Sequence, residues 1–285
     1  MIRSERKFGM ALLGVVAVWL SVVPAHALAQ SGAAKLVPHR AVYEMTLDGT
    51  RPASGISGVQ GRMVFDFDGS GCEGYTMNMR LVTRIQAQSG RSSISDLRSS
   101  TWEQGAGKLY RFNSSYYLGQ TLEESTRGNA ERSGSDGQVK VQVSAPKAKE
   151  LKLAGPVLFP TQHSLEILAA AQAGKKMLQA RVYDGSSKGS KVFATTTFIG
   201  KRLEPGAKLP SKRVANDDIL EKLVSWPVSI SYFDTGAEAK ETPAYQLDFR
   251  LYNNGVSREI LIDYGDFSIK GVLSALEIRP FPGCK

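Results

Sequence analysis

The sequence predicts a mainly β fold, a sandwich or barrel of antiparallel strands that carries one helix. Short runs in which apolar and polar residues alternate, such as residues 75–81, are typical of half-buried strands. Turn residues, above all glycine, recur between these runs about every 10 residues. Residues 163–173 alone combine helical spacing with helix-end signals, so the pattern argues against alternating βαβ units and a parallel sheet.

The first 29 residues have the features of a secretory signal peptide. Basic residues from Arg3 to Lys7 precede an apolar run over residues 8–20, and small residues follow as far as Ala29. A membrane anchor is the alternative, but an anchor needs about 18 or more apolar residues. We therefore expect cleavage after Ala29 or, as the other option, after Ala27.

The predicted organisation is a signal peptide over residues 1–29 and one β domain over residues 30–285. Cleavage removes three basic side chains and one acidic one, which lowers the net charge from +9 to +7. No later stretch is long and apolar enough to span a bilayer. The mature chain is therefore expected in an exported, oxidising compartment and not within the membrane.

The excess of basic residues is spread along the chain and interleaved with acidic residues. Such a pattern is typical of a solvated surface, and weak attraction to anionic lipid or to an envelope polymer is the alternative. The densest cluster, residues 147–152, includes Glu150. An exported chain without a nucleic-acid-binding motif is not expected to bind nucleic acid.

The predicted elements follow one another with short connections. Asn253-Asn254-Gly255 is a strong hairpin signal, and the stretch 144–160, which contains three prolines, is the only plausible divide between two halves. Strands are predicted over residues 41–47, 62–67, 75–81, 93–103, 108–118, 121–131, 138–143, 178–183, 192–199, 226–234, 244–252, 256–264 and 267–278.

The helix over residues 163–173 has its own end signals. Thr161 is a suitable N-cap, and Gly174 suits the left-handed position after the last turn. Its apolar stripe, which includes Leu165 and Leu168, is broad. We therefore expect this helix to pack against a sheet or to fill the opening of a barrel.

The only two cysteines are predicted to form a structural disulfide. Cys72 lies in a glycine-rich turn over residues 69–74, and Cys284 is the penultimate residue. An even number of cysteines in an exported chain indicates pairing. Neither cysteine has metal ligands at close spacing, and the Cys-x-x-Cys pattern of a redox pair is absent. A bridge between Cys72 and Cys284 would fix the end of the chain.

The mature sequence offers few residues for catalysis. It has two histidines, His39 and His163, and the acid that stands out is Asp184, within an Asp-Gly-Ser turn. No Gly-x-Ser-x-Gly elbow, phosphate-binding loop, dinucleotide fingerprint or HExxH motif accompanies them. We therefore predict no catalytic residues, no metal and no cofactor, and treat the three side chains as polar positions of structural or functional importance.

Several segments, in order, resemble the EipB family of Gram-negative periplasmic proteins, long known as a domain of unknown function. They cover essentially the whole mature chain. The matching segments are Leu-Val-Pro-His-Arg-Ala-Val-Tyr (36–43), Gly-Cys-Glu-Gly-Tyr (71–75), Phe-Pro-Thr-Gln-His (159–163), Val-Tyr-Asp-Gly-Ser (182–186) and Pro-Gly-Cys (282–284).

This resemblance implies an antiparallel β-spiral, a broken β-barrel with one long α-helix, similar in shape to bacterial lipoprotein carriers. It also implies a disulfide between Cys72 and Cys284, a periplasmic location, and association with a helical-repeat protein. No catalytic residues are known for the family, so none carry over. His39 and His163 match family positions whose role is undefined.

Three hypotheses for function follow. The first is a non-catalytic periplasmic protein that supports the integrity of the cell envelope through protein partners. The second is a carrier or binder of a lipid or an acylated protein. The third, a cell-wall hydrolase, would use His163 and Asp184 with one of the serines.

Overall fold

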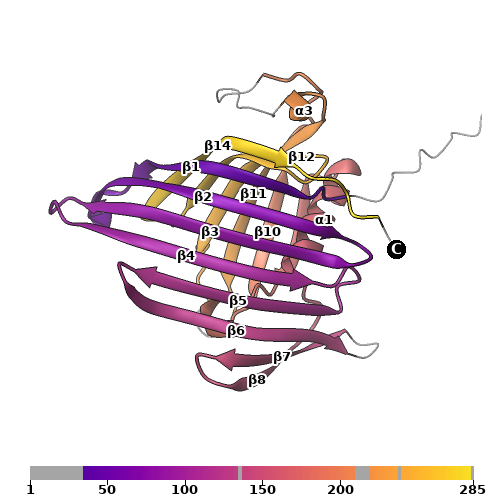
Figure 1. Ribbon diagram of the computed structural model, residues 1–285, viewed down its shortest axis with the longest axis horizontal. Helices are drawn as coiled ribbons and strands as arrows, with labels where there is room; N and C mark the ends of the chain where they lie inside the picture. The colour runs from indigo at the N-terminus through magenta and orange to yellow at the C-terminus, as the bar shows by residue number, and fades with distance from the viewer. Residues whose placement is uncertain (1–34, 134–136, 209–217, 237–238, 284–285) are drawn as a thin grey trace, which may run out of the picture. The chain divides into compact units, whose positions relative to one another are not determined.

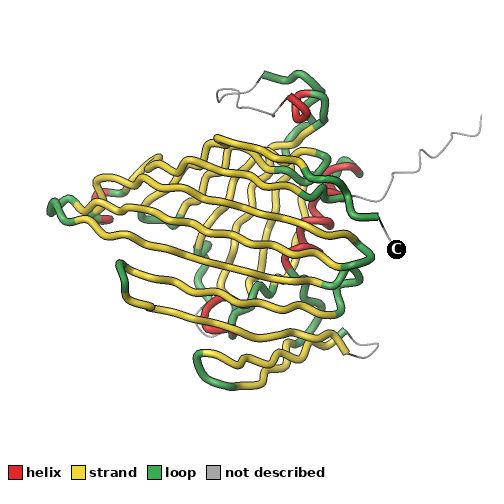
Figure 2. The backbone as a smooth tube through the Cα atoms, viewed as in Figure 1, coloured by secondary structure: helices red, strands yellow, loops and turns green. Residues whose placement is uncertain are grey.

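The computed structural model describes residues 35–133, 137–208, 218–236 and 239–283 (Figures 1 and 2). Fourteen strands lie within them: β1 (His39–Thr50), β2 (Ile56–Ser70), β3 (Gly74–Ala87), β4 (Ser92–Glu103), β5 (Leu109–Leu118), β6 (Thr121–Ser133), β7 (Gln138–Ala145), β8 (Lys149–Leu153), β9 (Met177–Val182), β10 (Phe193–Ile199), β11 (Ser225–Asp234), β12 (Tyr245–Tyr252), β13 (Ser257–Asp263) and β14 (Phe267–Ile278). The helices there are η1 (Pro52–Ser54), α1 (Pro160–Gln172), α2 (Ser186–Gly189) and α3 (Asp218–Glu221).

All fourteen strands belong to one antiparallel sheet. Its order is β8-β7-β6-β5-β4-β3-β2-β1-β14-β13-β12-β11-β10-β9, so the first and last strands pair in its middle. The sheet does not close, because β8 and β9 are its two edges. This architecture, with one helix longer than a single turn in the described part of the chain, confirms the predicted mainly β, broken-barrel class.

The apolar core forms where the two halves of the sheet face each other. One cluster joins β1, β2 and β3 to β12, β13 and β14 through residues such as Tyr43 and Leu273. A second packs α1 against β11 and β12 around Leu168 and Trp226. A third packs the inner face of β5 to β8 on Phe159 and the segment after β9. The curled sheet thus turns one face inward along its length.

The helix was predicted correctly, but its N-cap was not. Phe159 occupies the N-cap position and Pro160 begins the helix, whereas Thr161 lies inside the first turn. Two first-turn N–H groups donate instead to Glu103, at the end of β4. Gly174 has the predicted left-handed conformation, with φ of 73°.

The stretch 144–160 does not interrupt the sheet. Residues 149–153 form β8, which pairs with β7 and extends the same sheet. Leu158 then exchanges backbone hydrogen bonds with the far edge, donating to Arg181 and accepting from Tyr183. The charged residues of 147–152 therefore belong largely to an exposed edge strand, where charge discourages pairing with another chain.

Two of the turns predicted from the sequence are present. Residues 253–256 connect β12 to β13, with Gly255 at φ of 87°. The turn that contains Cys72 connects β2 to β3, and the Cys72 side chain is exposed. The predicted signal peptide and Cys284 lie outside the described residues, so cleavage and the disulfide stay predictions.

Candidate functional site

A cavity of about 610 Å³ lies inside the curled sheet. Its wall comes from both halves of the chain: β1 to β6 on one side, β11 to β13 on the other, and α1 at one end. Protein interiors are normally close-packed, with few voids larger than a water molecule. A space of this size falls within the range of small-molecule binding sites, about 300–1,000 Å³.

Most of the wall is apolar. Three methionines, Met63, Met77 and Met79, lie on β2 and β3 and face Phe249 and Ile262 from β12 and β13 across the cavity. Methionine side chains are flexible and polarizable, so they adapt to ligands of different shape. This part of the cavity suits an unbranched apolar chain better than a polar small molecule.

Small side chains on β4 and β5 leave the space between these walls. Ser99 and Ser114 are cross-strand partners on the inward face, and Thr101 lies on the same face. Larger inward residues surround them, including Met79, the partner of Ser99 on β3. Because serine and threonine fill little volume, the opposite halves of the sheet do not meet here.

Polar groups gather at one end of the cavity, around the turn after β9. Asp184 accepts the N–H of Ser186 at 2.9 Å, and its backbone oxygen accepts the hydroxyl of Tyr110 at 2.9 Å. Burial raises the pKa of the Asp184 carboxyl. Tyr232 and Tyr245 stack nearby with ring centroids 4.4 Å apart. This end can bind a polar group, whereas most of the remaining wall is apolar.

The turn that carries Asp184 is held in place by packing. Gly185 has φ of 76°, and a Cβ there would come within 2.5 Å of the Phe112 ring. Glycine is thus required both by the left-handed backbone and by the ring beneath it. The Asp-Gly-Ser motif therefore has a clear structural role in placing Asp184 at the cavity wall.

His163 lies on α1 and lines the same cavity. It is buried, and its Nε2 is 3.4 Å from Thr195 Oγ1 on β10. Burial lowers the pKa of His163 to about 4. Its imidazole is therefore neutral at physiological pH.

His39 lies at the start of β1, also on the cavity wall. Its Nδ1 is 2.8 Å from the backbone oxygen of Val37. Its ring contacts those of Phe65 and Phe67, with centroids 5.7 and 6.0 Å away. Burial is the main cause that lowers its pKa. Its surroundings are those of a core histidine.

The three polar positions singled out in the sequence thus line one cavity, but they do not form a catalytic triad. Among the described residues, the hydrogen bonds of His39, His163 and Asp184 go to different partners, as given above. In the same part of the chain, no group of three or more His, Cys, Asp or Glu residues is arranged to hold a metal ion.

Acidification is expected to destabilise the protein through His163. The folded state favours neutral imidazole, whereas the unfolded chain binds a proton near the ordinary pKa of 6.5. The contribution of neutral His163 to the free energy of unfolding is therefore fully present above pH 6.5, and it is lost as the pH falls through about 4. One pKa unit corresponds to about 1.4 kcal/mol, so the loss is about 3 kcal/mol.

The measurement is urea unfolding of the wild type and of His163→Leu at pH 7 and pH 4. Leucine has a similar size and does not titrate, so we expect the variant to lose about 3 kcal/mol less than the wild type over this range. Equal losses in the two proteins would show that His163 is not the group responsible.

The sequence did not identify the cavity wall as a site. Period-two alternation marks which side chains point inward, and Met77 and Met79 were on the predicted inward face. The alternation does not tell which inward side chains pack together and which surround a cavity. The small residues Ser99 and Ser114 were the available signal, because serine is unusual on an inward face.

The fold and the cavity define a class: an open, barrel-like antiparallel β protein with an internal, largely apolar cavity. The family model described as EipB-like matches residues 30–280. The chain belongs to this EipB-like family.

Two relatives agree with this assignment. The cell envelope integrity protein EipB of Brucella abortus (strain 2308) is 39% identical over 254 residues, which cover 89% of this chain and 88% of that protein. A crystal structure of a β-barrel-like protein of domain of unknown function DUF1849, from Brucella abortus, has a TM-score of 0.79 and 40% identity. It covers 87% of this chain and is itself covered completely.

None of the helices in the described residues has the length and hydropathy that a bilayer crossing requires.

Proposed function

We propose that this protein is a non-catalytic periplasmic protein that supports the integrity of the cell envelope by holding an apolar chain in its cavity. The name of the Brucella relative supports the envelope role. The predicted signal peptide supports the location. A lipid or an acylated protein would supply the chain.

The observation that carries the proposal is the composition of the cavity wall. An apolar surface formed by Met63, Met77, Phe249 and neighbouring side chains surrounds about 610 Å³. Burial of each methylene group of an acyl chain in such a space contributes about 0.8 kcal/mol. The polar end around Asp184 would contact the head group, which gives the ligand one favoured orientation.

The non-catalytic part of the proposal follows from the surroundings of the titratable groups. A hydrolase of the type considered above needs a histidine within hydrogen-bond reach of a nucleophile and oriented by an acid. The hydrogen-bonding neighbour of His163 is Thr195 on β10, whose hydroxyl donates to the backbone oxygen of Ala180. Asp184 is engaged by its own turn.

Filling the cavity is expected to abolish ligand binding and envelope protection together. Ser114→Phe places a large ring on the inward face of β5, in the space that the chain would occupy. We expect the variant, purified from the periplasm, to show only the mass of the polypeptide by native mass spectrometry. The wild type should retain a bound lipid or acyl group.

The matched control is Ser229→Phe, the same change on the outward face of β11, next to the cavity residue Ile230. Ser229→Phe should bind ligand and restore detergent resistance to a deletion strain, whereas Ser114→Phe should not restore it. A wild-type protein without ligand would contradict the cavity proposal. Wild-type detergent resistance of the deletion strain would contradict the envelope role.

A periplasmic protein partner remains part of the proposal, as the family resemblance implies. A pull-down from crosslinked envelopes would test it, and recovery of no helical-repeat protein would count against that class of partner.

A further inference from the structure

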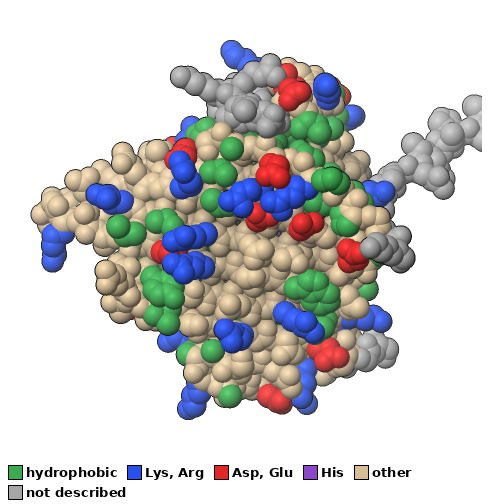
Figure 3. All heavy atoms as spheres, in the orientation of Figure 1, with side chains coloured by type: hydrophobic (Ala, Val, Ile, Leu, Met, Phe, Trp, Pro, Cys, Tyr) green, Lys and Arg blue, Asp and Glu red, His purple; other side chains and the backbone are tan. Residues whose placement is uncertain are grey.

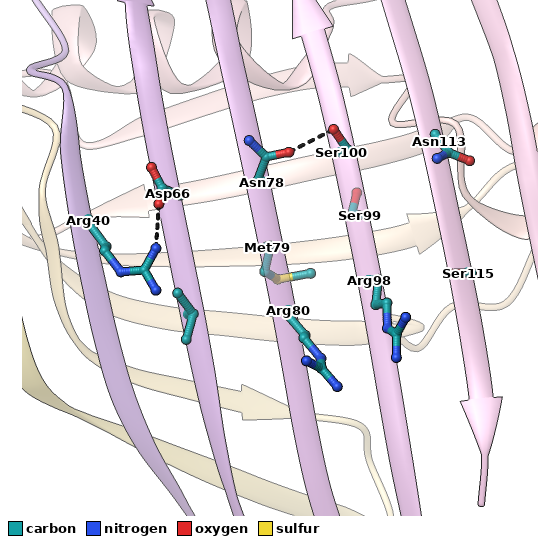
Figure 4. Close-up of a pocket in the computed structure, with 11 residues that line it drawn as sticks. Arg40, Asp66, Asn78, Met79, Arg80, Arg98, Ser99, Ser100, Asn113 and Ser115 are labelled. Carbon is teal, nitrogen blue, oxygen red and sulfur yellow. Dashed lines mark hydrogen bonds and ion pairs between the residues drawn. The ribbon is translucent and has the colours of Figure 1, made fainter. Parts of the chain in front are cut away.

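A shallow groove of about 360 Å³ crosses the outer face of β1 to β5 (Figure 4). Asn78 and Arg80 belong to this face, and they alternate along β3 with Met77 and Met79, which line the internal cavity. The groove is therefore a second site, separated from the cavity by the thickness of the sheet.

A pair of arginines borders the groove on one side. Arg80 and Arg98 are cross-strand partners on β3 and β4, and their side chains extend in the same direction (Figure 4). Each donates Nε and Nη2 to the Asp96 carboxylate at 2.7–3.1 Å. Hydrogen bonds from the two arginines lower the pKa of Asp96 to about 2, so it is charged at neutral pH. One carboxylate offsets one of the two positive charges.

The arginine pair is positioned in advance for an anion. Asp96 fixes one edge of each guanidinium, and the Tyr117 ring lies 4.9 Å from the centre of the Arg98 guanidinium. Among the hydrogen bonds within the described residues, neither Nη1 group takes part. The two arginine side chains are 56% and 51% exposed, so these N–H groups can reach a ligand.

Besides the arginine pair, the Arg40–Asp66 ion pair, at 2.7 Å, lines the groove, and the other lining side chains are uncharged and include several hydrogen-bonding groups. Ser100 donates to Asn78 at 2.7 Å, and Asn113 follows in register on β5. Trp102 of β4 and Arg111 of β5 are also cross-strand partners, and the centre of the Arg111 guanidinium lies 5.3 Å from the centroid of the Trp102 ring. On this face clusters of basic and acidic side chains lie around an area without charged side chains (Figure 3).

We propose that this groove binds an acidic sugar unit, such as a uronate residue of an anionic polysaccharide. Arginine binds carboxylates through paired N–H groups, and the carboxamide and hydroxyl groups of Asn78, Ser100 and Asn113 match sugar hydroxyls as both donors and acceptors. The inference does not depend on what fills the internal cavity.

The test is calorimetric titration of the mature protein with trigalacturonate and with its uncharged methyl ester. We expect the acid to bind at least about tenfold more tightly than the ester, a difference of about 1.4 kcal/mol. Arg80→Gln/Arg98→Gln should weaken binding of the acid by about the same factor. The control Arg84→Gln/Arg91→Gln removes two exposed arginines outside the groove and should change the affinity less than about twofold.

Equal binding of acid and ester, or equal losses in the two double variants, would overturn the proposal.

Titration with galacturonate monomer separates the possible sources of the ligand. Comparable affinity for monomer and trimer assigns the groove to a free sugar acid, and a large gain in affinity with length assigns it to a polymer. If the groove variant is unfolded, Arg98→Gln alone, which keeps the Arg80–Asp96 pair, takes its place. If the Arg80→Gln/Arg98→Gln variant still retains the ligand in the internal cavity, a negative result for sugar binding in the groove leaves the cavity proposal intact.

Discussion

Replacing Glu103 by alanine is expected to lower the free energy of unfolding by about 3 kcal/mol. Glu103 is 1% exposed, and its carboxyl oxygens accept the N–H groups of Thr161 and Gln162 at 2.7 and 2.9 Å. These are first-turn donors of α1, which have no partner within the helix. Alanine leaves the buried N–H of Thr161 and the partly buried N–H of Gln162 without an acceptor, and it leaves a cavity where the side chain was.

The structural context makes this effect larger than that of an ordinary helix cap. Glu103 ends β4, so its side chain ties the helix to the inner face of the sheet across 58 residues of sequence. Burial raises the pKa of its carboxyl group, although the two N–H groups act in the opposite direction. The expected loss corresponds to a fall in melting temperature of roughly 6 to 12 °C.

Thermal unfolding of Glu103→Ala, Glu103→Gln and Glu131→Ala would measure the effect. Glutamine keeps an acceptor oxygen, so we expect an intermediate melting temperature. Glu131 is exposed on β6, and its replacement should cost no more than about 0.5 kcal/mol. A melting temperature of Glu103→Ala equal to that of Glu131→Ala would refute the capping role.

The strands could be predicted from the sequence because alternation is a local property of each run. β3 shows it clearly, with Tyr75, Met77, Met79 and Leu81 on the inward face. β8 was missed because residues 147–152 are dominated by charge and follow Pro146. An edge strand has only one neighbour and tolerates charge, so its pattern does not differ from that of a loop.

The site depends on contacts between residues that are distant in the sequence. Thr161 was a reasonable N-cap by composition, but the acceptor that the fold supplies is Glu103, from another element. The cavity likewise exists because Ser114 on β5 lies opposite side chains of β12 and β13 in the curled sheet. The family resemblance indicated the fold correctly but carried no information about either contact.

Replacing Cys72 by serine is expected to lower the free energy of unfolding by about 4 kcal/mol. A bridge to Cys284 would close a loop of more than 200 residues, for which chain entropy alone gives roughly 5 kcal/mol as an upper value. The described part of the chain brings Arg279, five residues before Cys284 in the sequence, to the end of the sheet that carries the Cys72 turn. Arg279 forms ion pairs with Asp66 and Asp68 on β2, just before the Cys72 turn, and its N–H donates to the backbone oxygen of Pro38.

The bridge makes a sharper prediction than a loss of stability. Because the two sulfurs would stabilise only as a pair, Cys72→Ser, Cys284→Ser and the double variant should all melt roughly 8 to 16 °C below the wild type, without additivity. Reductant should lower the wild-type melting temperature to the same value and leave the variants unchanged. Glu73→Ser, in the same exposed turn, controls for the turn itself. Additive losses from the two single replacements, or a wild type insensitive to reductant, would mean that the sulfurs are not bonded and that Arg279 and its carboxylates alone hold the end of the chain.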